Sequence, residues 1–364
     1  MIIQMNVMVT SIAFVVAALC AGLMGFAIQR GATCTVAAVN EVVNKRRVNR
    51  LVAIAEASVW VTGGLLIAQM LNLLAKMPAG YPVNYLTVLG GALLGLGAFI
   101  NGACVFGAIA RLGSGEWAYL ATLPGFYVGC LSLSSWLPHP AHQSLDHGSF
   151  VLRAPASVSL LFTAFVIWRI ARPLLTARPD GSGPDMFQRV RQGIATRVWS
   201  PHAATTVIGV TFLLMLLLVG AWSYTDVLTE LARGMASSLV TRSLLLLALL
   251  LGAMLGGCTA GRSGGAAVQL SQLCKCFLGG ALMGSGSLLI PGGNDGLLLV
   301  GMPLLYPYAW VAFVAMCVAI GAATLVQNAV FRITRRSSTW STTKSRLSAQ
   351  LCVQRRNDRK DNDF

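Results

Sequence analysis

Long apolar blocks separated by short polar segments make up most of the chain. A helix needs about 20 apolar residues to cross the hydrocarbon core of a bilayer, so each block predicts one transmembrane helix. The pattern therefore predicts an all-α polytopic membrane protein with about nine crossings. The blocks fall at about residues 5–28, 51–75, 84–110, 117–137, 154–175, 203–222, 240–257, 266–290 and 307–329.

Glycines and polar residues interrupt the apolar pattern at four places where a helix should continue. In hydrocarbon every peptide group needs an internal partner, so a broken helix survives only where its opened backbone lines a cavity inside the protein. We therefore expect glycine-broken or re-entrant segments around a solute pathway. The four breaks are Gln29 to Cys34, Asn101 to Cys104, Gly256 to Arg262 and Gly292 to Asp295.

A weak internal repeat relates two halves of the chain. Residues 90–97 read Gly-Gly-Ala-Leu-Leu-Gly-Leu-Gly and residues 279–286 read Gly-Gly-Ala-Leu-Met-Gly-Ser-Gly, and a break follows each. A looser match pairs Arg30 with Arg262. Small residues alone serve close helix packing, but interrupted segments at corresponding positions of two halves point to a transporter's binding site. We expect pseudo-symmetric halves at about residues 1–175 and 200–330, within one integral membrane domain, 1–330.

Composition agrees with a membrane setting. Hydrophobic residues make up 55% of the chain and charged residues 11%, with a mean hydropathy of +0.70, whereas a soluble domain carries roughly 25% charged residues. The net charge of +15 would suit a nucleic-acid binder, but the basic residues lie between apolar blocks rather than on one soluble face. We therefore expect no nucleic-acid partner and attribute the charge to membrane topology.

Basic segments set the expected orientation. They run from Lys45 to Arg50, from Arg169 to Arg197 and from Arg332 to Lys360. The positive-inside rule assigns them to the cytoplasm, which places the N-terminus outside and the C-terminus inside a bacterial-type inner membrane. We expect residues 176–200 to be a cytoplasmic linker and residues 331–364 a disordered basic tail attracted to anionic lipid.

The cysteines and histidines do not form a metal-binding pattern. The nine cysteines include no Cys-x-x-Cys pair, and His139, His142 and His147 are irregularly spaced in one loop. We therefore expect no structural metal, disulfide framework or cofactor.

The breaks carry groups that suit an anion. A half-helix that begins after a glycine turn points free N–H groups and its positive dipole end into the gap. Thr33, Thr259 and Asn294 offer hydroxyl or amide donors. Arg30 and Arg262 either join this site or extend to the lipid headgroups. A thiol adds a soft, polarizable sulfur, which suits a sulfur-bearing anion, and in apolar surroundings we expect it to stay protonated.

At these motifs the chain resembles the YeeE/YedE family of sulfur-transport membrane proteins. The resemblance rests on Gly25 to Cys34, Gly102 to Gly107, Gly257 to Gly261 and Gly292 to Asp295. It implies an inner-membrane carrier of two pseudo-symmetric halves that passes thiosulfate between cysteine thiols, often beside a cytoplasmic sulfur-relay protein. The matching positions make Cys34, Cys104 and Cys258 the candidate route thiols, whereas Asn294 and Asp295 stand where a symmetric set would have a fourth cysteine.

Two hypotheses follow. The first is a transporter, not an enzyme, that takes up thiosulfate or a related small sulfur anion. The second is a membrane sulfur-transfer protein that forms a cysteine persulfide for a cytoplasmic sulfurtransferase; it needs an activated thiol, and no histidine neighbours the three candidate cysteines in sequence. The predicted substrate-binding residues are Cys34, Cys104, Cys258, Arg30, Arg262, Asn101, Thr259 and Asn294.

Overall fold

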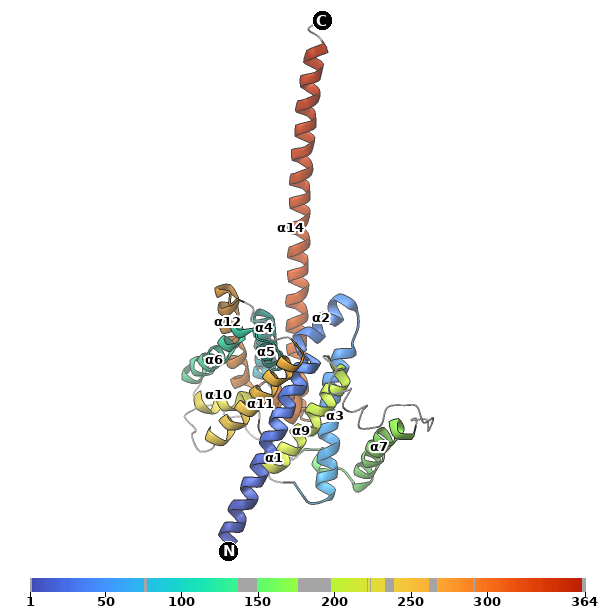
Figure 1. The fold of residues 1–364 in the computed structure, drawn as a ribbon, viewed down its shortest axis with the longest axis vertical. Coiled ribbons are helices and arrows are strands. Elements are labelled where there is room, and N and C mark those ends of the chain that lie inside the picture. Colours follow the sequence, from blue (N-terminus) through green and yellow to red (C-terminus); the bar gives the residue numbers. More distant parts are fainter. Residues whose placement is uncertain are drawn as a thin grey trace. The chain divides into compact units, whose positions relative to one another are not determined.

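The structure is a computed structural model of the chain. It describes all residues except 1, 75–76, 137–148, 176–197, 221, 223, 233–238, 262–266, 291 and 362–364, and main chain alone at 2–10, 135–136, 169–175, 224, 226 and 335–361. The chain divides into two compact units, Met1–Ile320 and Gly321–Phe364. All regular structure in the described residues is helical (Figure 1).

The helices follow the apolar blocks, with additional helices at the breaks. The α-helices are α1 (Ile2–Gly31), α2 (Thr35–Lys45), α3 (Asn49–Met70), α4 (Tyr85–Asn101), α5 (Val105–Gly113), α6 (Thr122–Trp136), α7 (Ala156–Leu175), α9 (Pro201–Val219), α10 (Tyr224–Ala232), α11 (Leu239–Thr259), α12 (Leu270–Leu289), α13 (Asn294–Gly296) and α14 (Pro307–Asp361). Short 3-10 or π turns occur at η1 (Trp117–Ala121), η2 (Val151–Arg153) and η3 (Leu297–Gly301).

Six helical segments among the described residues are long and apolar enough to cross a membrane, which makes the chain a polytopic membrane protein. A seventh is added if Leu270–Leu289 and Asn294–Gly301, bent by 52°, form one broken span. The count of nine crossings and the pseudo-symmetry stay predictions. The six segments are Ser11–Lys45, Asn49–Met70, Tyr85–Gly113, Pro201–Val219, Leu239–Thr259 and Pro307–Thr334.

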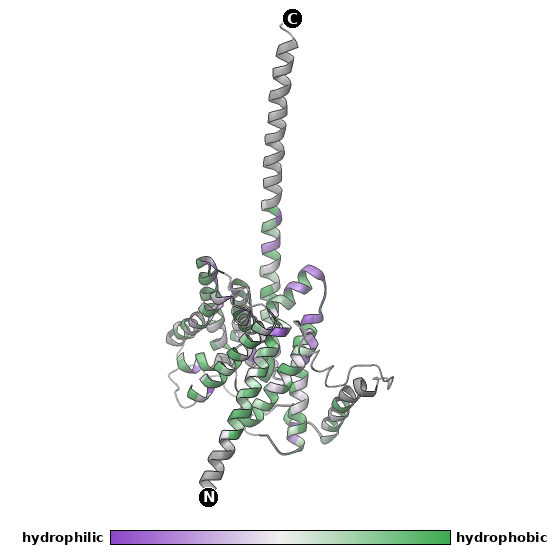
Figure 2. Cartoon of the chain, viewed as in Figure 1, coloured by the Kyte–Doolittle hydropathy of each residue, from purple (hydrophilic) through white to green (hydrophobic). Residues whose placement is uncertain are grey.

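Hydrophobic residues make up most of the helices in the first unit (Figure 2), and many of their large apolar side chains are exposed. Leu19 is 70% exposed and Leu161 is 74% exposed. In water such a surface would favour association, whereas lipid tails solvate it. The exposed apolar surface therefore agrees with a bilayer as the solvent of this unit.

Glycines set how closely the helices pack in the first unit. A Cβ atom on Gly97 would lie 2.7 Å from the carbonyl oxygen of Gly279, and one on Gly286 would lie 2.7 Å from that of Gly90. The two glycine segments that resemble each other in sequence therefore pack directly against each other, as α4 against α12. Small residues allow this approach of two backbones.

The second unit consists of the later turns of α14, which runs as helix to Asp361. The basic segment that we expect to be disordered from residue 331 thus has helical main chain in the structure. The predicted linker lies largely outside the described residues, as does the loop that contains His139, His142 and His147.

Candidate functional site

Two of the predicted breaks have the same local design. α1 ends at Gly31, Ala32 has a positive φ of 46°, and α2 begins at Thr35 after an extended Cys34. α4 ends at Asn101, Gly102 turns the chain with a φ of 76°, and α5 begins at Val105 after an extended Cys104. Each cysteine therefore occupies the N-cap of a half-helix, where backbone N–H groups lack intrahelical partners.

The two cysteines face each other across these breaks. The backbone N–H of Thr35 donates to the Sγ of Cys104 at 3.2 Å, and the backbone N–H of Cys104 donates to the Sγ of Cys34 at 3.4 Å. The sulfur of each break thus interacts with the helix N-terminus of the other. We call Cys34, Thr35 and Cys104 the thiol junction.

Gly107 makes the thiol junction possible. A Cβ atom on this residue would lie 2.5 Å from the Sγ of Cys34, so any side chain would push α5 away. Cys104 is fully buried and Cys34 is partly buried. The junction is therefore a closed contact.

Cys34 lines a polar cavity of about 340 Å³. Beside it, the hydroxyl oxygens of Thr33 and Thr35 are buried without a hydrogen-bond partner among the described residues. Buried polar groups are normally paired, so these hydroxyls are available to a ligand. The cavity is lined by Gln29, Ala32, Cys34, Val36, Ala37, Asn40, Arg50, Gly102, Gly107, Ala110, Arg111, Ser114 and Glu116.

Arg30 and Thr259, both predicted site residues, are joined by a hydrogen bond. Arg30 is only 2% exposed, and its Nη2 donates to the Oγ1 of Thr259 at 2.8 Å. Its guanidinium also lies 5.0 Å from the ring centroid of Phe26. Cys258 is exposed at the end of α11 and does not line the cavity. Arg262 lies outside the described residues.

Asn101 and Asn294 occupy different environments. The Nδ2 of Asn101 donates to the carbonyl of Ala103 at 2.7 Å, and its Oδ1 accepts from the Oγ1 of Thr122 at 3.0 Å. Asn101 thereby holds the shape of the break before Cys104. Asn294 is fully buried, and neither of its amide atoms has a hydrogen-bond partner among the described residues.

Asp295, next to Asn294, is held by one residue of α10. The Oγ1 of Thr225 donates to the Oδ1 of Asp295 at 2.6 Å, and the backbone N–H of Thr225 donates to its Oδ2 at 3.3 Å. These two hydrogen bonds attach the break after α12 to α10, which is a structural role for the carboxylate.

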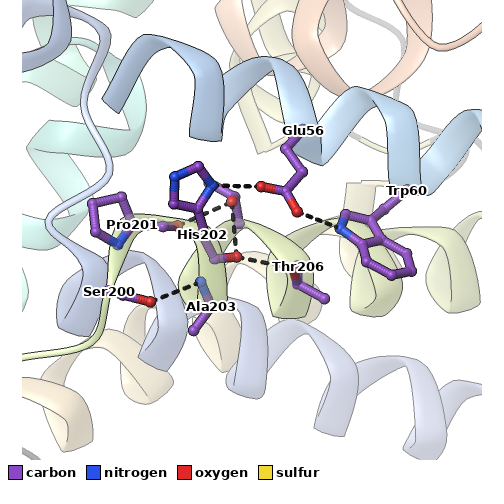
Figure 3. A network of polar contacts seen from close by, with 8 residues as sticks. Glu56, Trp60, Ser200, Pro201, His202, Ala203 and Thr206 are labelled. Carbon is purple, nitrogen blue, oxygen red and sulfur yellow. Dashed lines mark hydrogen bonds and ion pairs between the residues drawn. The ribbon is translucent and has the colours of Figure 1, made fainter. Parts of the chain in front are cut away.

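A second polar cluster, which the sequence did not indicate, joins α3 to α9 (Figure 3). The Nδ1 of His202 lies 2.6 Å from the Oε2 of Glu56, and the Nε1 of Trp60 donates to the Oε1 of Glu56 at 3.4 Å. Ser200 caps α9 by accepting from the N–H of Ala203 at 3.2 Å. The cluster fixes the position of α3, whose first turn carries Arg50.

Sequence reasoning also missed the polar lining of the cavity. The sequence indicates Arg50 only as a topological charge and Gln29 only as the first residue of a break, and it assigns Arg111 no role. Among the described residues, no group of three or more histidine, cysteine, aspartate or glutamate side chains could hold a metal ion.

One family model matches most of the chain. Residues 30–324 match the model described as sulphur transport. This range contains all eight predicted site residues. A search of curated proteins gave no match.

Proposed function

The chain belongs to the sulphur-transport (YeeE/YedE) family, and from this premise we propose that it takes up a small sulfur oxyanion, thiosulfate, through a narrow thiol-lined pathway. Family membership and the membrane-spanning helices support a sulfur transporter. The observation that carries the finer proposal is the thiol junction, where two sulfurs and two half-helix N-termini meet, next to a polar cavity that Cys34 lines.

The junction suits thiosulfate because it offers two kinds of contact. Backbone N–H groups at helix N-termini favour the charged oxygens of an anion, and the polarizable sulfurs favour its terminal sulfur. The unpartnered hydroxyls of Thr33 and Thr35 add donors beside the cysteines. Passage requires the two N–H to Sγ contacts to open, and the solute replaces each lost contact with one of its own.

The remaining predicted residues extend this route. We propose Cys258 as a third route thiol, placed at the end of α11 beside the Arg30–Thr259 contact. Asn101 shapes the junction, and Asn294 offers a buried amide at a further break. Arg262 is proposed as a binding residue from the sequence alone.

The proposed setting follows the charge pattern of the loops. The membrane domain covers residues 1–330, in halves 1–175 and 200–330, and the basic linker and tail are on the cytoplasmic side of an inner membrane. The N-terminus is then outside. A cytoplasmic sulfur-relay protein is the proposed acceptor, and anionic lipid contacts the tail.

Uptake of labelled thiosulfate tests the thiol route. Cells that lack other thiosulfate transport express the unchanged protein, Cys34→Ala or Cys104→Ala, and their uptake rates are compared. Cys20→Ala is the matched control, since Cys20 is a buried cysteine in the body of α1. We expect uptake to fall by about tenfold or more in the first two variants, as for loss of about 1.4 kcal/mol of favourable contact. Normal uptake in both, at equal membrane abundance, would refute the route.

The same geometry favours one second candidate function, a persulfide relay. N–H groups directed at both sulfurs would also stabilise a persulfide anion. In that reaction the S–S bond of thiosulfate breaks, its outer sulfur bonds to the Sγ of Cys34, the thiol proton is released, and sulfite leaves with the bonding electron pair. Mass spectrometry after incubation with thiosulfate distinguishes the two: a persulfide relay leaves one added sulfur atom on the protein, and a transporter leaves none.

A further inference from the structure

The cavity that Cys34 lines has the size and lining of a binding site. Its volume of about 340 Å³ lies within the range of about 300–1,000 Å³ typical of small-molecule sites. Three other cavities in the described part of the chain measure about 10, 30 and 10 Å³. This cavity is therefore large enough for a solute of several atoms beside the thiol junction.

Two arginines from different helices line this cavity. Arg50 comes from α3 and pairs through its Nε with Glu41 at 3.4 Å, and Arg111 comes from α5 and pairs through its Nη1 with Glu116 at 3.0 Å. Each of these pairs uses one nitrogen of a guanidinium group that offers five N–H donors. Both side chains are nearly half exposed, so their remaining donors are accessible from the cavity.

An aromatic ring holds one of these charges in place. The guanidinium of Arg111 lies 5.3 Å from the ring centroid of Tyr119. Burial raises the pKa of Tyr119 to about 12, so the phenol stays neutral at physiological pH and does not neutralise the arginine. Of the two glutamates in the pairs, only Glu116 lines the cavity, which leaves an excess of positive charge there.

Gln29 adds a buried polar side chain to the lining of this cavity. It lines the cavity, is only 1% exposed, and its Oε1 has no hydrogen-bond partner among the described residues. Its Nε2 donates to the Oγ of Ser114 at 3.3 Å.

We infer that this cavity is a second anion site, which holds a free divalent sulfur oxyanion beside Cys34 with Arg50 and Arg111 as its two cationic ligands. The inference rests on the proposed function and adds a binding step to it. Planar guanidinium groups bind oxyanions through paired N–H donors. The partly exposed ion pairs with Glu41 and Glu116 are weak, so an incoming anion can compete with the carboxylates.

Binding of sodium thiosulfate to the purified full-length chain, measured by isothermal titration calorimetry in phospholipid-free detergent, tests the site. We expect Arg50→Gln and Arg111→Gln each to weaken binding by about tenfold, as for one charge-assisted hydrogen bond. Glu116→Gln removes a competing carboxylate and is expected to strengthen binding about threefold. The matched control is Arg242→Gln, because Arg242 also pairs with a glutamate, Glu230, but does not line the cavity.

The outcomes separate this site from the thiol route. Unchanged affinity in both arginine variants, with uptake lost in Cys104→Ala, would overturn the anion site and leave the proposed function intact. Weakened affinity in the arginine variants, with normal uptake in Cys104→Ala, would support the site and overturn the thiol route. A parallel titration adds phosphatidylglycerol to the micelles. If this lipid binds in an Arg111-dependent way and thiosulfate does not, the cavity holds a lipid headgroup and the inference is wrong.

Discussion

The breaks at Cys34 and Cys104 differ from the breaks at Thr259 and Asn294 in how their polar groups are satisfied. The first two satisfy each other through reciprocal N–H to sulfur contacts. At the other two, Cys258 is exposed and the amide of Asn294 is buried without a partner among the described residues. Similar glycine-broken motifs therefore differ in their contacts, because the helix packed opposite each break decides what its polar groups contact.

The strongest test of this contrast is Gly107→Ala. A Cβ atom there would lie 2.5 Å from the Sγ of Cys34, and overpacking of this kind costs about 1–3 kcal/mol of stability. We expect a lower melting temperature in detergent and loss of uptake. Gly22→Ala is the control, because its Cβ would meet only an ordinary contact of 3.5 Å.

A second substitution locates the cause of that effect. Adding Cys34→Ala to Gly107→Ala removes the crowded sulfur and should restore most of the melting temperature. A double variant as unstable as Gly107→Ala would show that the strain does not come from the sulfur, because the Cβ atoms of residue 34 and Ala103, at 3.0 and 3.1 Å from the added Cβ, remain.

Asn294→Leu tests the unsatisfied break. A buried amide without partners costs about 1–3 kcal/mol of stability. An apolar side chain of similar size should therefore raise the melting temperature by the equivalent of about 1–2 kcal/mol. Uptake should fall in the same variant, because we propose that the amide binds the solute. Asn101→Leu provides the comparison, because Asn101 makes two hydrogen bonds and its loss should destabilise the protein. Destabilisation by both substitutions would remove the contrast between the two asparagines.

Thr259→Val should have a smaller effect. It removes the acceptor for the Nη2 of Arg30, and a hydrogen bond to a charged group contributes about 1.5–3 kcal/mol when buried and less when partly exposed, as here. We expect a loss of about 1 kcal/mol in unfolding free energy by denaturant titration. Thr259→Ser keeps the hydroxyl and should retain the stability; equal losses in both variants would assign the effect to packing.

The smallest effect concerns thiol accessibility. Cys258 is exposed and Cys104 is fully buried, so a maleimide reagent should label Cys258 early and Cys104 only after unfolding. Peptide mass spectrometry of a labelling time course measures this order. The exposed Cys274 serves as the internal standard, and early labelling of Cys104 would show that the thiol junction is open.

The helix breaks could be predicted from sequence because glycine and polar residues inside an apolar block weaken a membrane helix at that point. The structure ends α1 at Gly31, turns at Gly102 with a φ of 76° and turns at Gly292 with a φ of 85°. The membrane class followed from the same pattern. The number of crossings is less accessible to sequence reasoning, since α6, with 15 residues, is apolar but short.

The contacts between breaks could not be predicted. The sequence grouped Cys34 and Cys104 with Cys258 on equal terms, because spacing along the chain carries no information on which helices pack together. The contact between Arg30 and Thr259 joins residues 229 positions apart. Gly107 belongs to one of the motifs and was the one sequence sign of a close contact at this break. Its closeness to the sulfur of Cys34 is evident only in three dimensions.

The donors at the thiol junction are main-chain amides of Thr35 and Cys104, which no substitution other than proline removes. A serine at either cysteine position would inherit the one amide donor of that position, Cys104 N–H at residue 34 or Thr35 N–H at residue 104, and exchange only a large, soft atom for a small, hard one. The scaffold thus separates geometry from atom type, so the atom that accepts each of these hydrogen bonds can be changed from sulfur to oxygen without rebuilding the helices around it.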